Sequence, residues 1–575
     1  MFLKKSWSKN LQNFSIIFFL IWFIQSLPYF QDHQQSLVFK IIVVVCSFLI
    51  GLAFILNSDI NEKVQFNHGF ESGTTTSVVF VMIFFFATGV YLFNLGHINF
   101  YDDEFITISV AKGHLQTGEY LKWNFFNNES TGIEYNRAWP YTWLVSKTIG
   151  VLGISEFSVR LVSAIAGAGF IMMIAIIAQR LFGSIVITLT ICAVMLLQIE
   201  LLYYFRQGRM YGVLILMYSC LSILYFVIFE KVRNQEFKKL DWIFCILLAV
   251  LVIATILVHK NALILIVPLT LYPIFSTHKW VISTWRNYKL IIIPFAVVGV
   301  FYLIRFLIYY KFFEVFKLSD DPSYSYATYI FTGALNWEFN MVLFLLGLIL
   351  IFRMKECLLR RVMLFAYVTI IPSLILFVFL FQFPHESFRY VSHLVPVSII
   401  LIFCILIVVL NSINNSRVKN VGLCVLLILS CSKFLQANNL RHLYYGSVHP
   451  KFEVAYRTFL DNVEIDDTIF AAYMRSYYLQ DFSSDIDVID IVDSKVKTDE
   501  YSKSYTFDEF FKDINTVKKG WVIWPTAKSG NVNRKVKIYT NRFFHKIHGL
   551  DVDDTYVEVF RFDSTMVKKV NWIED

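Results

Sequence analysis

An acidic cluster directly after a long apolar segment is the feature of this sequence that most clearly indicates chemistry. Asp102, Asp103 and Glu104 open a polar stretch that carries further charged residues, namely Glu119, Glu129, Glu134 and Arg137. Carboxylates at a membrane boundary are unfavourable unless they are solvated, paired or used. A carboxylate that faces water, beside a substrate delivered from the lipid, can act as a general base.

Basic and aromatic residues recur at other points where apolar segments begin or end. Arginine forks at such a boundary could bind the phosphate of an anionic lipid headgroup, because they match its oxygens in two-point geometry. The groups are Arg206, Arg209 and Tyr211; His259 and Lys260; Lys311, Lys317, Asp320 and Asp321; and His385, Glu386, Arg389, Tyr390 and His393.

Each group also has an explanation that involves no chemistry. Acidic residues favour helix N-termini, so the acidic cluster could mark a solvated helix start. Arg206 and Arg209 are three residues apart, share a helix face and could simply reach lipid headgroups. His259 could be an ordinary interfacial residue, and the Arg389-Tyr390 pair could anchor a helix end.

The composition indicates the class of protein that must position these residues. Of the 575 residues, 57% are hydrophobic and 16% are charged, whereas a soluble domain has about 25% charged residues. The chain is therefore expected to be a polytopic membrane protein. The eight cysteines all lie in or beside apolar segments, which argues against a cysteine zinc site or a disulfide framework in the polar parts. The net charge of +8 reflects membrane topology rather than nucleic-acid binding.

A spanning helix needs about 20 apolar residues, and thirteen segments qualify. Trp139–Leu152 is too short and too polar to span, and we expect it to be a helix in the membrane interface. No cleavable signal peptide is evident, so the first apolar run is expected to stay as an anchor. The predicted spans are 12–29, 37–56, 77–95, 158–181, 184–203, 211–229, 242–258, 261–276, 290–308, 340–353, 362–382, 391–410 and 421–436.

Positive charge predicts the orientation of these spans. The N-terminus and four loops are basic and are therefore assigned to the cytoplasm, although the loop 57–76 carries only Lys63. With this parity, the acidic cluster and the boundary groups named above all face the outside. The basic residues are Lys4, Lys5 and Lys9; Lys231, Arg233, Lys238 and Lys239; Lys279, Arg286 and Lys289; Arg353, Lys355, Arg360 and Arg361; and Arg417 and Lys419.

The pattern divides the chain into three parts. Residues 1–76 form an N-terminal helix pair, residues 77–436 form a transmembrane core with an external acidic loop at 96–157, and residues 437–575 form an external domain. In that domain, apolar runs predict strands and polar stretches predict helices, which indicates a small α/β domain. The expected strands are Thr468–Tyr473, Ile486–Val492, Trp521–Trp524 and Tyr556–Phe562, and the expected helices are Phe452–Asn462 and Phe507–Val517. No nucleotide-binding loop is found, so an ATP-driven pump is unsupported.

An ordered set of short motifs resembles the lipid-linked sugar transferases of the C-type membrane glycosyltransferase fold, which include protein O-mannosyltransferases and aminoarabinose transferases. The resemblance covers residues 77–410. Most members of this fold place the acidic loop after the first span, whereas here two additional spans precede it, and an even number of added spans keeps the loop on the outside. The motifs are Tyr101–Phe105 followed by Ala111, Gly113 and Gly118; Pro140; Gly153–Ser163; Arg180–Gly183; Tyr204–Tyr211; Val258–Lys260; and Phe388–Tyr390 with Pro396.

The resemblance implies transfer of a sugar from a polyprenyl-phosphate donor to an acceptor hydroxyl on the non-cytoplasmic side of the cell membrane. Asp103 matches the aspartate of the family's Asp-Glu pair and would be the base, with Asp102 as the alternative. Glu104 would orient the acceptor or the neighbouring carboxylate. The donor-binding set would comprise Arg206, Arg209 and Arg389 on the phosphate, with Lys260, His259, Tyr211 and Tyr390 assisting.

Other interpretations of the same residues stay open. The set requires no cofactor, although the acidic cluster could hold a divalent cation. A transporter or flippase of a lipid-linked sugar would share the apolar body but should carry ionisable groups near the bilayer midplane, where the spans have almost none. A non-catalytic scaffold would leave the clustered polar residues unexplained. The acceptor can be a glycan, a lipid or a protein.

The parity predicts that the acidic segment and the C-terminal domain face the same, non-cytoplasmic side. Cysteines introduced at Ser130 and Ser529 should therefore both react with a membrane-impermeant thiol reagent in intact cells. A cysteine introduced at Ser416, in a predicted cytoplasmic loop, is the matched control and should react only after permeabilisation. Labelling of only one of the first two cysteines would contradict the thirteen-span topology.

Overall fold

The computed structural model describes the parts of the chain that carry most of the predicted site. The chain divides into two compact units, one made of residues 1–93, 137–141 and 161–440 and the other of residues 94–136, 142–160 and 441–575. The described residues are 74–100, 102–125, 128–234, 236, 241–276, 337–380, 388–412, 462–464, 466–471, 487–491, 505–525, 532–547 and 557–568.

The first unit is a bundle of apolar helices. Within the described residues, four helices are long and apolar enough to cross a membrane, and a fifth span results if one bent pair is counted as one. The chain is thus a multi-pass membrane protein. Its helices are α4 (Thr74–Leu92), α7 (Glu156–Phe182), α8 (Ile185–Leu197), α9 (Ile199–Phe205), α10 (Tyr211–Arg233), α11 (Trp242–Val258), α12 (Ile266–Ser276), α16 (Trp337–Arg353), α17 (Leu358–Ile375) and α18 (Val395–Ser412).

Nine of the thirteen predicted spans coincide with these helices. The other four, at 12–29, 37–56, 290–308 and 421–436, lie outside the described residues. One predicted span needs correction, because 184–203 is not one straight helix: α8 and α9 meet at a 69° bend. The bend lies at Gln198, whose backbone is extended and whose side chain accepts a hydrogen bond from the Leu201 amide. A side chain that caps a new helix in this way ends the previous one.

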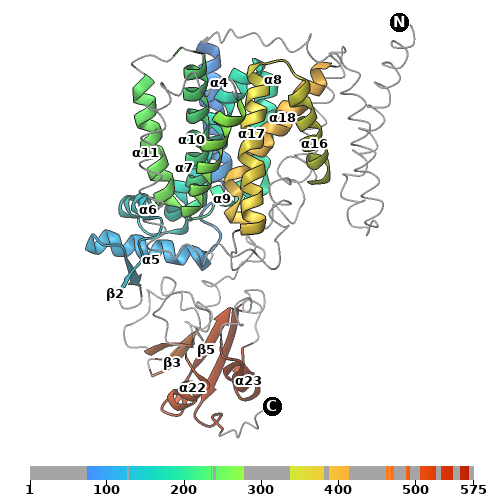
Figure 1. The fold of residues 1–575 in the computed structure, drawn as a ribbon. Helices are drawn as coiled ribbons and strands as arrows, with labels where there is room; N and C mark the ends of the chain where they lie inside the picture. Colours follow the sequence, from blue (N-terminus) through green and yellow to red (C-terminus); the bar gives the residue numbers. More distant parts are fainter. Residues whose placement is uncertain are drawn as a thin grey trace, which may run out of the picture. The chain divides into compact units, whose positions relative to one another are not determined.

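Short non-α segments shape the bundle beside the predicted site. A 3-10 turn, η2 (Lys260–Leu265), precedes α12, and two more, η4 (Phe388–Tyr390) and η5 (Ser392–Leu394), precede α18. α17 continues as a π-helical turn, η3 (Leu376–Leu380). α10 contacts α11, η2 and η5, while α17 lies beside α16 and α18 (Figure 1).

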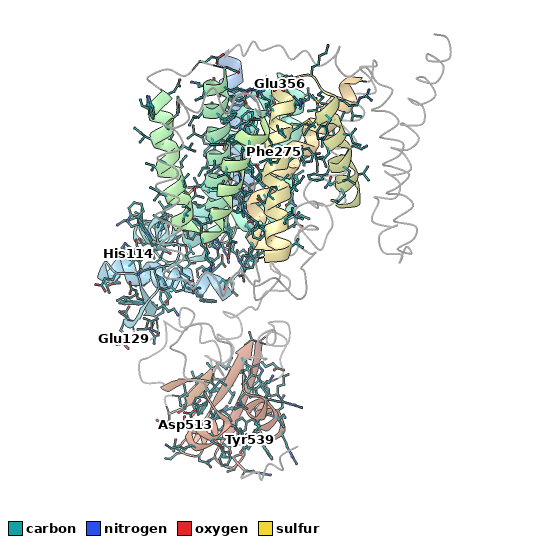
Figure 2. The ribbon with its side chains drawn as sticks, in the orientation of Figure 1. His114, Glu129, Phe275, Glu356, Asp513 and Tyr539 are labelled. Atoms are coloured by element: carbon teal, nitrogen blue, oxygen red, sulfur yellow. The ribbon has the colours of Figure 1, made fainter. Side chains whose placement is uncertain are left out.

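An ion-pair network centred on the buried Glu230 holds the C-terminal end of α10. Arg361 and Arg233 both pair with Glu230, and Tyr272 donates a hydrogen bond to it at 3.3 Å. Arg233 also pairs at 2.8 Å with Glu356, which precedes α17 (Figure 2). Because charges buried among apolar helices require partners, this network connects α10, α12 and α17 at one end of the bundle. The candidate site lies at the opposite end of α10.

The first segment of the second unit was expected to be a polar loop, and the structure corrects this. Asp102–Thr117 form a helix, α5, which is followed by a two-stranded hairpin of β1 (Leu121–Asn124) and β2 (Glu129–Glu134). A Cβ atom on Gly113 would lie 1.9 Å from the Leu121 carbonyl oxygen. The strand therefore packs directly on the helix backbone, which only glycine permits.

A short helix, α6 (Trp139–Leu152), follows the hairpin with the same bounds as the predicted interfacial helix. It buries Val145 and Ile149 and exposes Trp143, Val151 and Leu152. An exposed apolar face with a tryptophan is typical of a helix at a membrane surface, although its position in the interface stays a prediction.

The described residues after 461 contain a five-stranded mixed sheet in the order β4-β3-β5-β7-β6. β3 is parallel to β4 and β5, and β7 is antiparallel to β5 and β6. The strands are β3 (Thr468–Ala471), β4 (Asp487–Asp490), β5 (Lys519–Pro525), β6 (His545–Lys546) and β7 (Val557–Asp563). Four of the five lie at the predicted strand positions.

Two helices accompany this sheet, α22 (Phe507–Ile514) and α23 (Arg534–Phe543). α22 begins with a capping box between Thr506 and Glu509 and lies where a helix was predicted. α23 has no counterpart among the predicted elements, although Val536, Tyr539 and Phe543 recur at helical spacing within its polar sequence. The predicted helix Phe452–Asn462 lies almost wholly outside the described residues, and the external location of the domain stays a prediction.

Candidate active site

The acidic cluster forms the first turn of α5, and Asp103 and Glu104 have different environments. Asp103 is half-buried, whereas Glu104 is 1% exposed. Glu104 accepts two hydrogen bonds from Arg160, at 2.9 Å from Nε and 2.7 Å from Nη2. This is a buried bidentate ion pair, the geometry in which arginine binds a carboxylate most strongly.

The remaining hydrogens of Arg160 bind the segment that leads from α4 to α5. Nη1 donates to the carbonyl oxygens of Leu95 and Ile98, at 3.0 and 2.7 Å, and Nη2 donates to that of Asn99 at 3.0 Å. A guanidinium has five N–H groups, and all five are used here. Arg160 thereby holds the approach to Asp103 in a single conformation.

These contacts revise the role expected for Glu104. Its carboxylate is buried and committed to Arg160, so the structure places it as an anchor of α5 rather than as a group that touches the acceptor. Arg160 belongs to the motif Gly153–Ser163, from which the sequence predicts no role for it. An ionisable residue at the start of a long apolar helix needs a partner, and this rule could have indicated the ion pair with Glu104. The choice between Asp102 and Asp103 as the base stays a prediction.

Arg206 also has a role different from the predicted phosphate contact. It is buried, and its Nη1 donates to the carbonyl oxygens of Tyr91 and Phe93 at 2.8 and 2.6 Å. These carbonyls end α4, where the last helical carbonyls lack intrahelical partners. A cation at a helix C-terminus is stabilised by the helix dipole as well. Arg206 is therefore placed as a cap of α4.

The other predicted donor-binding residues come together in the bundle. Tyr211 begins α10, and its ring lies 5.5 Å from the ring of His259, which ends α11. The side chain of Asn261 donates a 3.4 Å hydrogen bond to the carbonyl oxygen of Tyr390, which connects η2 to η4. Segments separated by more than a hundred residues therefore meet at one end of α10.

The electrostatics of this cluster are one-sided. Burial, followed by the nearby His393, Lys260, Arg209 and Arg389, lowers the pKa of His259 to about 3. The imidazole is therefore neutral at pH 7. Arg137 adds a further positive charge near Lys260. Among the described residues, the permanent charges that act on His259 are those of Lys260, Arg209 and Arg389, and they would stabilise a bound anion at this place.

The tautomer of His259 follows from its backbone contact. Its Nδ1 accepts a hydrogen bond of 3.1 Å from the Asn261 amide, so the proton of the neutral ring lies on Nε2. His259 then offers an uncharged N–H donor among the surrounding cations. Such a donor suits a phosphate oxygen or a hydroxyl oxygen, and the role of His259 in donor binding stays a prediction.

No group of three or more histidine, cysteine, aspartate or glutamate side chains that could hold a metal ion is found in the described part of the chain. The arrangement can bind an anion and can hold a carboxylate beside water.

Comparison with known proteins places the fold. No protein-family model matches the sequence, and no curated protein sequence is significantly similar to it. Among solved structures, ArnT from Cupriavidus metallidurans in the apo state has a TM-score of 0.53 at 12% identity, over 86% of this chain and 99% of that chain. Its complex with undecaprenyl phosphate gives the same TM-score and identity, over 87% and 100%. Arabinosyltransferase EmbB from Mycobacterium smegmatis has a TM-score of 0.39 at 13% identity, over 64% and 34%.

The pair between Arg160 and Glu104 predicts a large effect from a nearly isosteric change. Glu104→Gln leaves a buried arginine without its counter-charge and should cost about 3–5 kcal/mol of stability, the usual effect of breaking a buried ion pair. Thermal unfolding of the purified protein in detergent measures it. Glu129→Gln, at an exposed glutamate of the same unit, is the matched control. Equal stability of the two variants would mean that the pair does not hold α5.

Proposed function

We propose that this chain, which has the fold of the C-type membrane glycosyltransferases, moves a sugar from a polyprenyl-phosphate donor to an acceptor hydroxyl. The observation that carries the proposal is the cationic cluster of Arg209, Lys260 and Arg389 around the neutral His259. A membrane enzyme that binds a lipid phosphate requires such a site. ArnT, which shares the fold, has been crystallised with undecaprenyl phosphate.

The cluster suits the leaving group of this reaction. As the bond between the anomeric carbon and the phosphate oxygen breaks, its electron pair passes to the phosphate, which becomes more negative. Fixed cations then stabilise the transition state more than the ground state. Arg209 and Arg389 supply guanidinium forks, Lys260 supplies a point charge, and His259 adds an N–H donor from Nε2.

The acidic segment suits the other half of the reaction. A carboxylate of the first turn of α5 takes the proton of the acceptor hydroxyl while its oxygen attacks the anomeric carbon. We assign this role to Asp103, with Asp102 as the alternative. The buried pair of Arg160 and Glu104 supports the assignment, because it fixes the turn in which both aspartates stand.

The sidedness and the substrates are part of the same proposal. Transfer takes place at the non-cytoplasmic face of the cell membrane, and the C-terminal domain lies on that side, as the basic loops predict. The donor can carry a hexose or a pentose, and the acceptor can be a glycan, a lipid or a protein. No nucleotide or nucleic acid takes part.

The test of the base is transfer by purified protein from a panel of undecaprenyl-phosphate sugars to acceptors in a membrane extract. Asp103→Asn should lower turnover by about 10²–10⁴-fold, the usual effect of losing a general base. Asp102→Asn is the matched control and should lose less. An inactive Asp102→Asn beside an active Asp103→Asn would transfer the role to Asp102, and wild-type protein inactive with every donor would refute the proposed function.

The test of the phosphate site compares two arginines. Arg389→Lys keeps the charge but loses the fork, and losing a charge-assisted contact of about 1.5–3 kcal/mol should weaken use of the donor by roughly ten- to a hundredfold. Arg206→Lys should lower thermal stability and leave the donor KM unchanged, because Arg206 binds backbone carbonyls. If Arg206→Lys weakened use of the donor and Arg389→Lys only lowered stability, the roles assigned to the two arginines would be exchanged. If Arg389→Lys left use of the donor unchanged, Arg389 would not belong to the phosphate site.

A further inference from the structure

A pair of buried, uncharged polar side chains lies at the same end of the bundle as the cationic cluster. His393 of η5 and Tyr218 of α10 are both fully buried, and their ring centroids are 4.5 Å apart. Neither nitrogen of His393 has a hydrogen-bond partner, and neither has the Tyr218 hydroxyl. The nearby α10 residues Ser219 and Ser222 bury further hydroxyls without partners.

Such a group is unusual in a folded protein. Buried polar atoms are nearly always hydrogen-bonded, and each buried atom left unpaired costs about 1–3 kcal/mol. These side chains cannot turn to solvent, because His393 is also covered by Phe377 of the π-helical turn η3 at 6.3 Å. The unused donors and acceptors therefore indicate a place that is filled by a polar partner.

The pair borders the proposed phosphate site. His393 follows Arg389 by four residues, and its turn, η5, contacts both η4, which contains Arg389, and α10. His393 is also the second residue of the described span Ser392–Val409, so it stands at the end of the membrane segment. A molecule whose phosphate binds the cationic cluster would bring its next group to this pair.

The chemistry of the pair selects the kind of group. A neutral imidazole offers one donor and one acceptor, and a phenol hydroxyl offers both. The oxygens of a phosphodiester only accept, so they would leave the imidazole acceptor unsatisfied. A sugar hydroxyl both donates and accepts and can satisfy each atom of the pair. An isoprenoid chain has no polar atom to offer.

We infer that His393 and Tyr218 form the subsite that binds ring hydroxyls of the donor sugar, next to the phosphate held by Arg209, Lys260 and Arg389. The inference rests on the proposed function and adds to it the residues that distinguish a sugar-loaded lipid from the bare lipid phosphate. It assigns recognition of the sugar to helices of the bundle, in residues that the motifs of the sequence did not indicate.

The test compares two lipids that differ only in the sugar. Binding of undecaprenyl phosphate and of the undecaprenyl-phosphate sugar that wild-type protein prefers is measured for Tyr218→Phe in detergent. The variant should bind undecaprenyl phosphate within twofold of wild type and the sugar-loaded lipid about three- to tenfold more weakly, the range for one hydrogen bond. Because the lost hydroxyl has no protein partner, thermal stability should be kept or raised.

Two further variants serve as controls. Tyr225→Phe, on the same helix, removes a hydroxyl that donates a 2.7 Å hydrogen bond to the Leu269 carbonyl oxygen. It should lower stability and leave the preference between the two lipids unchanged. His393→Leu should lose the preference for the sugar-loaded lipid, and His393→Asn, which keeps a donor and an acceptor, should retain part of it.

The possible outcomes separate the explanations. Equal weakening of both lipids by Tyr218→Phe would place the pair on the phosphate, and no change in either would mean that only water fills the place. Wild-type protein that binds undecaprenyl phosphate and every sugar-loaded lipid equally well has no sugar subsite. Each of these results would overturn the inference and leave the proposed function standing. Failure of the wild type to bind either lipid would instead refute the proposed function.

Discussion

The pairing of Arg160 with Glu104 is the interaction on which the acidic segment of this protein depends. Arg160 stands in the first turns of a long apolar helix, where an unpaired guanidinium would be strongly unfavourable. It uses all five of its N–H groups, two on Glu104 and three on carbonyls of the chain before α5. That segment would otherwise leave its backbone carbonyls buried without partners. Arg160 therefore fixes the segment between α4 and α5, and with it the turn that carries Asp102 and Asp103.

The same rule explains three other arginines in the described part of the chain. Arg206 caps the carbonyls at the end of α4, and Arg233 and Arg361 pair with Glu230 at the opposite end of α10. In contrast, Arg209, Lys260 and Arg389 place three positive charges around the neutral His259 in the described part of the chain. A concentration of positive charge favours an anionic ligand at this place. This contrast, more than any single residue, supports a lipid phosphate as the ligand.

Local sequence patterns predicted the positions of most helices and strands, but not the bend at Gln198 or the helix that follows Tyr101. Runs of apolar residues located nine predicted spans at the positions of described helices, and shorter apolar runs located β3, β4, β5 and β7. The bend at Gln198 was missed because a glutamine that caps a helix has the same composition signal as one inside it. The sequence predicts a loop after Tyr101 because the apolar residues of α5 are interleaved with polar ones, although the helix buries Phe105, Ile108 and Ala111.

Runs of neighbouring residues were enough to predict a membrane protein, the approximate positions of most described helices, and the residue types at their boundaries. How those boundary residues are used depends on their contacts in the folded chain. Glu104 meets Arg160 across 56 positions, and Arg206 meets Tyr91 across 115. A partner that far along the chain leaves no periodic trace in the sequence. For the same reason, the unpaired His393 and Tyr218 became visible only when α10 and η5 were brought side by side.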